Sequence, residues 1–252
     1  MTKDLTQGSP MRLILGFTLS TLLGLLFQQL YNVVDTMIVG KLLGSQALAA
    51  VGSTGSVNFL VIGFCTGVCS GFAIPVAQRM GSGEHSKMRQ CVANAAWLSA
   101  GFALVLTAAT ALLCRTILVL MKTPADIFQD AYLYIFIIFL GIPATFLYNL
   151  LAGVARSLGD SRTPVYFLAL SSVLNIALDA GFILLFHTGV AGAALATVIS
   201  QLVSGVACFF YMRKKFPILH MSRTERAFDP HTAKVLCRMG LPMGLQYSIT
   251  AI

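Results

Sequence analysis

Two acidic residues inside long apolar runs are the groups in this sequence best suited to chemistry. Asp35 lies in the run 13–40 and Asp179 in the run 164–186. A charged side chain costs about 2.5–3.5 kcal/mol at the centre of a membrane helix, so an acid within a span indicates a functional site. Burial favours the neutral form of a carboxyl group, which suits it to capture and release H⁺. Its oxygens could instead bind a hard cation such as Na⁺.

Other polar residues share helix faces with these two acids. They form three stripes with spacings of three, four or seven residues, which place the members of a stripe on one side of a helix. Three polar stripes would suit a water-filled cavity inside a helical bundle, although hydrogen bonding between helices is an alternative use of the same groups. The stripes are Gln28, Tyr31, Asn32 and Asp35; Asn175 and Asp179; and Thr197, Gln201 and Ser204.

Two prolines also lie inside apolar runs. Pro75 and Pro143 each remove a backbone donor from a helix interior, so each predicts a kink. The kink could serve as a hinge or be static, and the sequence leaves both open.

The composition identifies the elements that must position these residues. Of 252 residues, 57% are hydrophobic and only 10% charged, and the mean hydropathy is +0.82. A soluble domain carries about a quarter charged residues, so a soluble enzyme is excluded. Continuously apolar runs longer than any barrel strand predict membrane-spanning helices and an all-α polytopic membrane protein, built as a six-helix bundle. The runs are 13–40, 47–78, 92–114, 131–155, 164–186 and 190–212.

The basic residues predict the orientation of the bundle. Of the 17 Lys and Arg residues, only Lys41, Arg115 and Lys122 lie in the segments on one side of the predicted spans. The positive-inside rule then places the N-terminus in the cytoplasm. The net charge of +8 is therefore interpreted as a signal that orients the chain in the lipid bilayer, and no nucleic-acid partner is expected. We expect a multi-pass protein of a cell membrane, in a bacterium the inner membrane.

The predicted organisation has three parts. Residues 1–212 form an N-terminal transmembrane lobe, residues 213–234 a basic cytoplasmic linker, and residues 235–252 the start of a seventh span. A linker after six spans, followed by a new apolar run, is typical of two-lobed transporters. Residues 239–246 also resemble residues 15–22 in their pattern of glycine and apolar residues, as an internal repeat would.

A specific motif adds a family to this interpretation. Residues 28–36 (Gln-Gln-Leu-Tyr-Asn-Val-Val-Asp-Thr), continuing through 39–44 and 47–52, closely resemble the opening of multidrug and toxic compound extrusion (MATE) transporters. The turn at 155–164 is similar to the turn between helices four and five of that family. The resemblance covers essentially the whole chain.

The resemblance implies a twelve-helix antiporter that exports cationic or amphipathic drug-like molecules in exchange for H⁺ or Na⁺, without a cofactor or structural metal. It implies a cation site formed by Asp35, Asn175 and Asp179, with Thr197 as a looser match. Family members commonly carry proline at the position of Ser20, a departure that weakens the expectation of a bend in the first helix. Pro242 occupies the corresponding place after the linker. We therefore expect an N-terminal half whose partner is a second lobe, either a C-terminal half or another copy.

Three alternatives remain open. A lipid-linked oligosaccharide flippase of the same superfamily would need cationic groups inside the cavity, and no Lys or Arg lies in the middle of a span. A half-protein that does not transport is a second alternative. An intramembrane aspartyl protease would need Asp35 and Asp160 as a catalytic dyad, although Asp160 belongs to a cytoplasmic turn.

Overall fold

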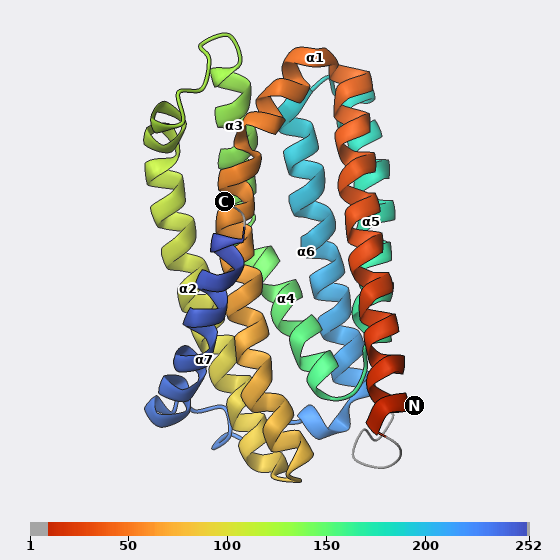
Figure 1. The fold of residues 1–252 in the computed structure, drawn as a ribbon, viewed down its shortest axis with the longest axis vertical. Coiled ribbons are helices and arrows are strands. Elements are labelled where there is room, and N and C mark those ends of the chain that lie inside the picture. Colours follow the sequence, from red (N-terminus) through yellow and green to blue (C-terminus); the bar gives the residue numbers. More distant parts are fainter. Residues whose placement is uncertain (1–9, 251–252) are drawn as a thin grey trace.

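The computed structural model describes residues 10–250, with the side chains of residues 10, 12–14, 17, 20, 21, 25 and 31 left out of the description. Helices account for nearly all of the described residues, and none of these residues lies in a strand. This arrangement confirms the predicted all-α class (Figure 1). The elements are α1 (Pro10–Gly81), α2 (His85–Leu120), α3 (Phe128–Leu140), α4 (Ile142–Ser157), α5 (Arg162–Ala180), a π-helix η1 (Gly181–Leu185), α6 (Gly189–Lys215), a 3₁₀ turn η2 (Pro217–Leu219) and α7 (Pro230–Ile249).

Helix α1 is a pair of antiparallel arms (Figure 1). Gly44 separates them, with φ 86° and ψ −176°, a conformation that only glycine adopts readily. Without this break, 60 apolar residues at about 1.5 Å each would extend about 90 Å, three times the thickness of the hydrocarbon layer. The first arm (residues 10–43) and the second arm (residues 45–81) correspond to the first two predicted spans.

The predicted span 131–155 is broken into α3 and α4, which meet at Gly141 with a bend of 46°. A Cβ atom on Gly141 would lie 2.4 Å from Cγ2 of Val198, so the absence of a side chain lets α6 approach the bend closely. Pro143 lies in the first turn of α4, where its missing N–H leaves no intrahelical bond unmade.

Six segments of the bundle are suited to cross a membrane. Four of the described helices are long and apolar enough to do so, and the bent pair α3 and α4 adds a fifth. Because α1 consists of two arms, it contributes two crossings. Helix α7 is not among these helices over its described length.

Helix α7 packs along the second arm of α1 through glycine-to-glycine contacts (Figure 1). A Cβ atom on Gly71 would lie 2.6 Å from Cα of Gly240, and one on Gly67 would lie 2.8 Å from Cα of Gly244. Small residues at this spacing allow two helix backbones to come together closely. The hydroxyl of Ser248 donates to the carbonyl oxygen of Leu60 at 3.0 Å and closes the upper end of the contact.

The segment between α6 and α7 differs in extent from the predicted linker 213–234. Helix α6 continues to Lys215, and α7 begins at Pro230. The chain between them, residues 216–229, is called the strap below because it is bonded to α2 at several points.

Candidate functional site

The two in-span acids of the sequence lie together in the structure. The carboxyl groups of Asp35, on the first arm of α1, and Asp179, at the end of α5, approach within hydrogen-bonding range. Asp179 is fully buried. In each residue Oδ1 is buried and receives no hydrogen bond from the described part of the protein. Two ionised carboxylates at this range repel each other, so the pair suits a shared proton or an intervening cation.

Asn175 connects this pair to α6. Its amide is oriented by the neighbouring hydrogen-bonding groups. In the satisfied orientation, Nδ2 donates to Oδ2 of Asp179 at 3.1 Å and the amide oxygen accepts from the backbone N of Thr197 at 3.2 Å. The Thr197 hydroxyl donates to the carbonyl of Ala193 at 3.0 Å. The four residues expected to form the cation site therefore form one contiguous polar cluster across α1, α5 and α6.

Tyr134 on α3 is an additional member of this cluster. Its side chain is buried, and its phenol lies close enough to Asp35 and Asp179 to interact electrostatically with both. Tyr134 does not stand out in the sequence, because a single tyrosine in an apolar run resembles ordinary packing. The one sequence feature that could have indicated Tyr134 is a hydroxyl within an apolar run, because such a group needs a hydrogen-bond partner when it is buried.

The local helix geometry changes directly after Asp179. Helix α5 ends at Ala180 and continues as the π-helix η1, in which backbone hydrogen bonds join residues five positions apart instead of four. π-Helical turns occur frequently at functional sites. The i, i+4 spacing of Asn175 and Asp179 within the regular part of α5 is what places both on one face.

The remaining predicted cavity residues are not part of this cluster. Gln28 and Asn32 have exposed side chains on the first arm, and the amide of Asn32 donates to Gln29 at 3.3 Å. Gln201 accepts a hydrogen bond from Thr145 at 2.9 Å, which connects α6 to α4. Only the backbone of Tyr31 is described, so the prediction for its side chain lies outside the described residues.

Ser204, Pro75 and Pro143 also lie outside the acid cluster. The hydroxyl of Ser204 donates to the carbonyl of Phe167 and connects α6 to α5, the interhelical alternative considered for the third stripe. Pro75 is buried within the second arm of α1, and Pro143 lies two residues beyond the bend at Gly141. Whether either proline acts as a hinge stays a prediction.

Asp160 has a structural role at the opposite end of α5. Its carboxylate accepts from the backbone N of Arg162 and Thr163 and from Lys215 Nζ at 2.6 Å. Burial alone would raise the pKa of Asp160, but the bonds from Lys215 and Thr163 outweigh it and lower the pKa. Helix α5 rises about 26 Å from Arg162, two residues beyond Asp160, to Asp179, which lies against Asp35. This distance excludes a protease dyad of Asp35 and Asp160.

The chemistry of the cluster suits a light monovalent ion. Among residues 10–250, no three His, Cys, Asp or Glu side chains lie together as a group able to hold a metal ion. The cluster offers two carboxyl groups, one amide and two hydroxyls, all oxygen-bearing groups that suit H⁺ or Na⁺ better than a transition metal.

Comparisons with known proteins point to one family. The MatE family profile matches residues 21–180. Two proteins of Bacillus subtilis are each 31% identical to the chain: the probable multidrug resistance protein YpnP, over 98% of this chain and 55% of its own length, and the probable multidrug resistance protein YoeA, over 100% and 56%. The chain thus spans about half the length of the curated relatives it matches.

A solved structure agrees with this result. The outward-facing conformation of a multidrug resistance MATE family transporter of the MOP superfamily superposes with a TM-score of 0.89 and 25% identity, over 97% of this chain and 54% of that one. The match covers both arms of α1 and the helices that carry the acid pair. The resemblance noted in the sequence is therefore confirmed, and the chain belongs to the MATE family.

Proposed function

We propose that this chain forms the first lobe of a cation-coupled multidrug antiporter, and that the Asp35–Asp179 pair is its coupling site. The pair carries the proposal, because a buried carboxyl group in contact with a half-buried one is costly unless a proton or a cation neutralises one of them. Family members are transporters rather than enzymes, and the cluster has no nucleophile paired with a base.

The proposed cycle uses the pair as a switch. With H⁺ or Na⁺ bound between the carboxyl groups, α1 and α5 are held together. Without it, repulsion between the two charges favours separation of the first arm of α1 from α5. A change in this helix pair would be coupled to drug release through the cavity between the two lobes. Asn175 and Thr197 would supply further oxygen ligands for Na⁺, and Tyr134 would donate to an ionised carboxylate.

The proposal extends to the arrangement of the whole protein. Residues 1–212 would form the first lobe, a second lobe would begin with α7, and the N-terminus would lie in the cytoplasm of a bacterial cell. The substrates would be organic cations or amphipathic drugs. Gln28 and Asn32 on the exposed side of the first arm would then line the cavity that these substrates enter.

The experiment replaces each acid in the complete transporter. Asp35→Asn and Asp179→Asn should each reduce ethidium efflux from energised cells at least about tenfold, because the amide can neither bind nor release a proton. Asp126→Asn, an exposed acid in the loop before α3, is the matched control and should leave efflux unchanged. Wild-type efflux by both variants, at equal amounts of protein in the membrane, would refute the assignment of the coupling site.

A second measurement distinguishes the two ions. Purified transporter in liposomes is given either a pH gradient or a Na⁺ gradient, and drug movement is followed by fluorescence. Acceleration by only one gradient, lost in Asp179→Asn, identifies the coupling ion. Transport that responds to neither gradient would contradict the antiport mechanism.

A further inference from the structure

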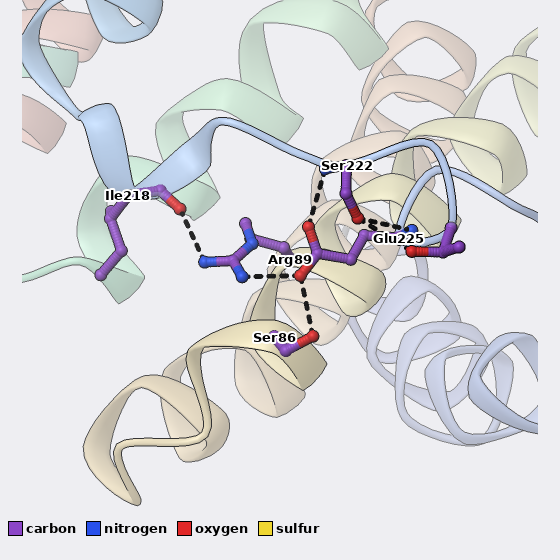
Figure 2. A network of polar contacts seen from close by, with 6 residues as sticks. Ser86, Arg89, Ile218, Ser222 and Glu225 are labelled. Atoms are coloured by element: carbon purple, nitrogen blue, oxygen red, sulfur yellow. Dashed lines mark hydrogen bonds and ion pairs between the residues drawn. The ribbon is translucent and has the colours of Figure 1, made fainter.

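The strap is fixed to α2 by a charged hydrogen-bond network (Figure 2). Oε1 of Glu225 accepts from Nη2 of Arg89 at 2.6 Å and from the hydroxyl of Ser86 at 2.8 Å. Its Oε2 accepts from the backbone N of Ser222 at 2.8 Å. The guanidinium group of Arg89 also reaches the carbonyl of Ile218 at 3.5 Å. Arg89 of α2 thus contacts the strap at two points, Ile218 and Glu225.

Two further contacts extend this attachment along α2. The indole Nε1 of Trp97 donates to the carbonyl of Arg226 at 3.1 Å. The side-chain oxygen of Asn94 accepts from the backbone N of Asp229 at 2.9 Å. The strap therefore follows the surface of α2 from Arg89 to Trp97 instead of extending freely from the bundle.

Acidic groups at this end of the bundle are engaged in internal contacts. Glu225 is paired with Arg89, and Asp229 caps the start of α7 by accepting from the backbone N of Thr232 at 3.0 Å. Asp160 is paired with Lys215. Each of these carboxylates is paired with a cation of the protein or accepts hydrogen bonds from its backbone.

The cations of the same region remain available at the surface. From the end of α6 to the first turns of α7, residues 213–238, six exposed Lys and Arg side chains pair with no acid among the described residues. Arg223 and Arg226 flank Glu225 in the strap, so the inward turn of that single acid leaves two outward arginines. The six are Arg213, Lys214, Arg223, Arg226, Lys234 and Arg238.

Exposed aromatic rings lie next to these cations. Trp97 is 59% exposed although its N–H group is bonded to the strap, and Phe228 is 55% exposed. Trp97 lies five residues inside the predicted span that begins at residue 92, a depth typical of tryptophan at the boundary between hydrocarbon and headgroups. Long arginine side chains at such a depth extend toward the headgroups. The surface therefore combines apolar rings for acyl chains with cations for phosphate.

We propose that the strap and the adjoining face of α2 form a binding surface for anionic phospholipid headgroups, with Arg223 and Arg226 as the phosphate-binding residues beside Trp97. Each Lys or Arg near a membrane surface strengthens attraction to anionic lipid about fivefold at low salt. The Arg89–Glu225 pair positions the strap so that both arginines lie at the level of the headgroups.

The chain contains one tryptophan, which makes Trp97 a built-in reporter of the lipid next to the strap. In liposomes of brominated phosphatidylglycerol mixed with unbrominated phosphatidylcholine, and in the reverse mixture, quenching of Trp97 fluorescence gives the relative affinity of the two lipids for this surface. For the complete protein, in which any tryptophan outside this chain is replaced by phenylalanine, we expect phosphatidylglycerol to be preferred at least about threefold, with the preference weakened in 0.5 M NaCl.

Two double variants isolate the position of the charges from their number. Arg223→Gln/Arg226→Gln should bring the preference close to one, whereas Lys41→Gln/Arg115→Gln, which removes two exposed cations elsewhere, should leave it unchanged. All four side chains are exposed, so both variants should fold. Equal quenching by the two lipids in the unmodified protein, or a preference retained in Arg223→Gln/Arg226→Gln, would overturn the proposal.

Discussion

Substitution of Gly71 by alanine tests the close contact between α7 and the second arm of α1. The added Cβ atom would lie 2.6 Å from Cα of Gly240, 2.7 Å from the carbonyl oxygen of Met239 and 2.9 Å from the backbone N of Gly240. All three neighbours are backbone atoms, so no side-chain rotation can relieve the overlap. The two helices must instead separate by about 0.8 Å to reach an ordinary contact of 3.4 Å.

The size of the effect follows from two opposing contributions. Overpacking of a well-packed interface typically costs about 1–3 kcal/mol. Replacement of glycine by alanine in a helix interior contributes about 0.5–1 kcal/mol of stabilisation. Gly55 lies on the same arm and has no atom within 4 Å of its added Cβ, so Gly55→Ala has only the second contribution. Gly71→Ala should therefore be less stable than Gly55→Ala by about 1–3 kcal/mol.

Thermal unfolding measured with a thiol-reactive dye is suited to this comparison. Cys65 and Cys69 are buried on the same arm and would react only when the helices separate. A difference of 1 kcal/mol shifts the melting temperature of a chain of this size by about 2–4 °C. Gly71→Ala should melt about 2–12 °C below Gly55→Ala. A melting temperature equal to or above that of Gly55→Ala would refute the close helix contact.

Two further predictions concern the end of the bundle where Asp160 and the strap lie. Asp160→Asn should lower stability by about 1 kcal/mol, because it weakens the cap of α5. The pKa of Asp160 is lowered in the folded state, so the stability that this carboxylate contributes should be present above about pH 4 and be lost as the pH falls further. A stability difference between wild type and Asp160→Asn that persists at pH 2 would contradict this. Glu225→Gln should release the strap and speed tryptic cleavage at Arg223 and Arg226 several-fold, whereas Glu84→Gln, which breaks an exposed pair of bridges to Arg79 and Lys87, should not. The bond from Arg89 lowers the pKa of Glu225, so the strap of the unmodified protein should resist trypsin equally at neutral and mildly acidic pH. Faster cleavage at pH 6 than at pH 8, corrected for trypsin activity, would contradict the attachment of the strap by the Arg89–Glu225 pair.

The transmembrane bundle and its acid pair could be predicted from local features of the sequence. Long apolar runs are explicit, and an ionised side chain in hydrocarbon is costly enough that Asp35 and Asp179 stand out against them. Helical spacing correctly placed Asn175 beside Asp179. It could not specify the neighbour that each face meets, such as Thr145 of α4, which donates a hydrogen bond to Gln201.

The strap and the helix bend depended on contacts that no local pattern reveals. Residues 216–229 contain a proline and charges of both signs, as a free linker would. Their attachment requires Arg89 and Trp97, more than a hundred positions earlier. The bend predicted from Pro143 lies within the turn that precedes it, at Gly141, whereas the close approach of Val198 of α6 at that point could not be read from the sequence. Tyr134 was missed for the same reason, because its polar partners lie on other helices.

The contact between α7 and the second arm of α1 also bears on the order of assembly. Ser248 and Leu60, which are bonded to each other, lie 188 positions apart in the chain. During synthesis the second arm therefore enters the membrane long before its partner exists, and its glycine-rich face must first pack against lipid. Contacts between segments this distant form late and slow a folding reaction. The strap shortens that delay, because once residues 216–229 attach to α2, α7 starts at a defined position beside the arm it must meet.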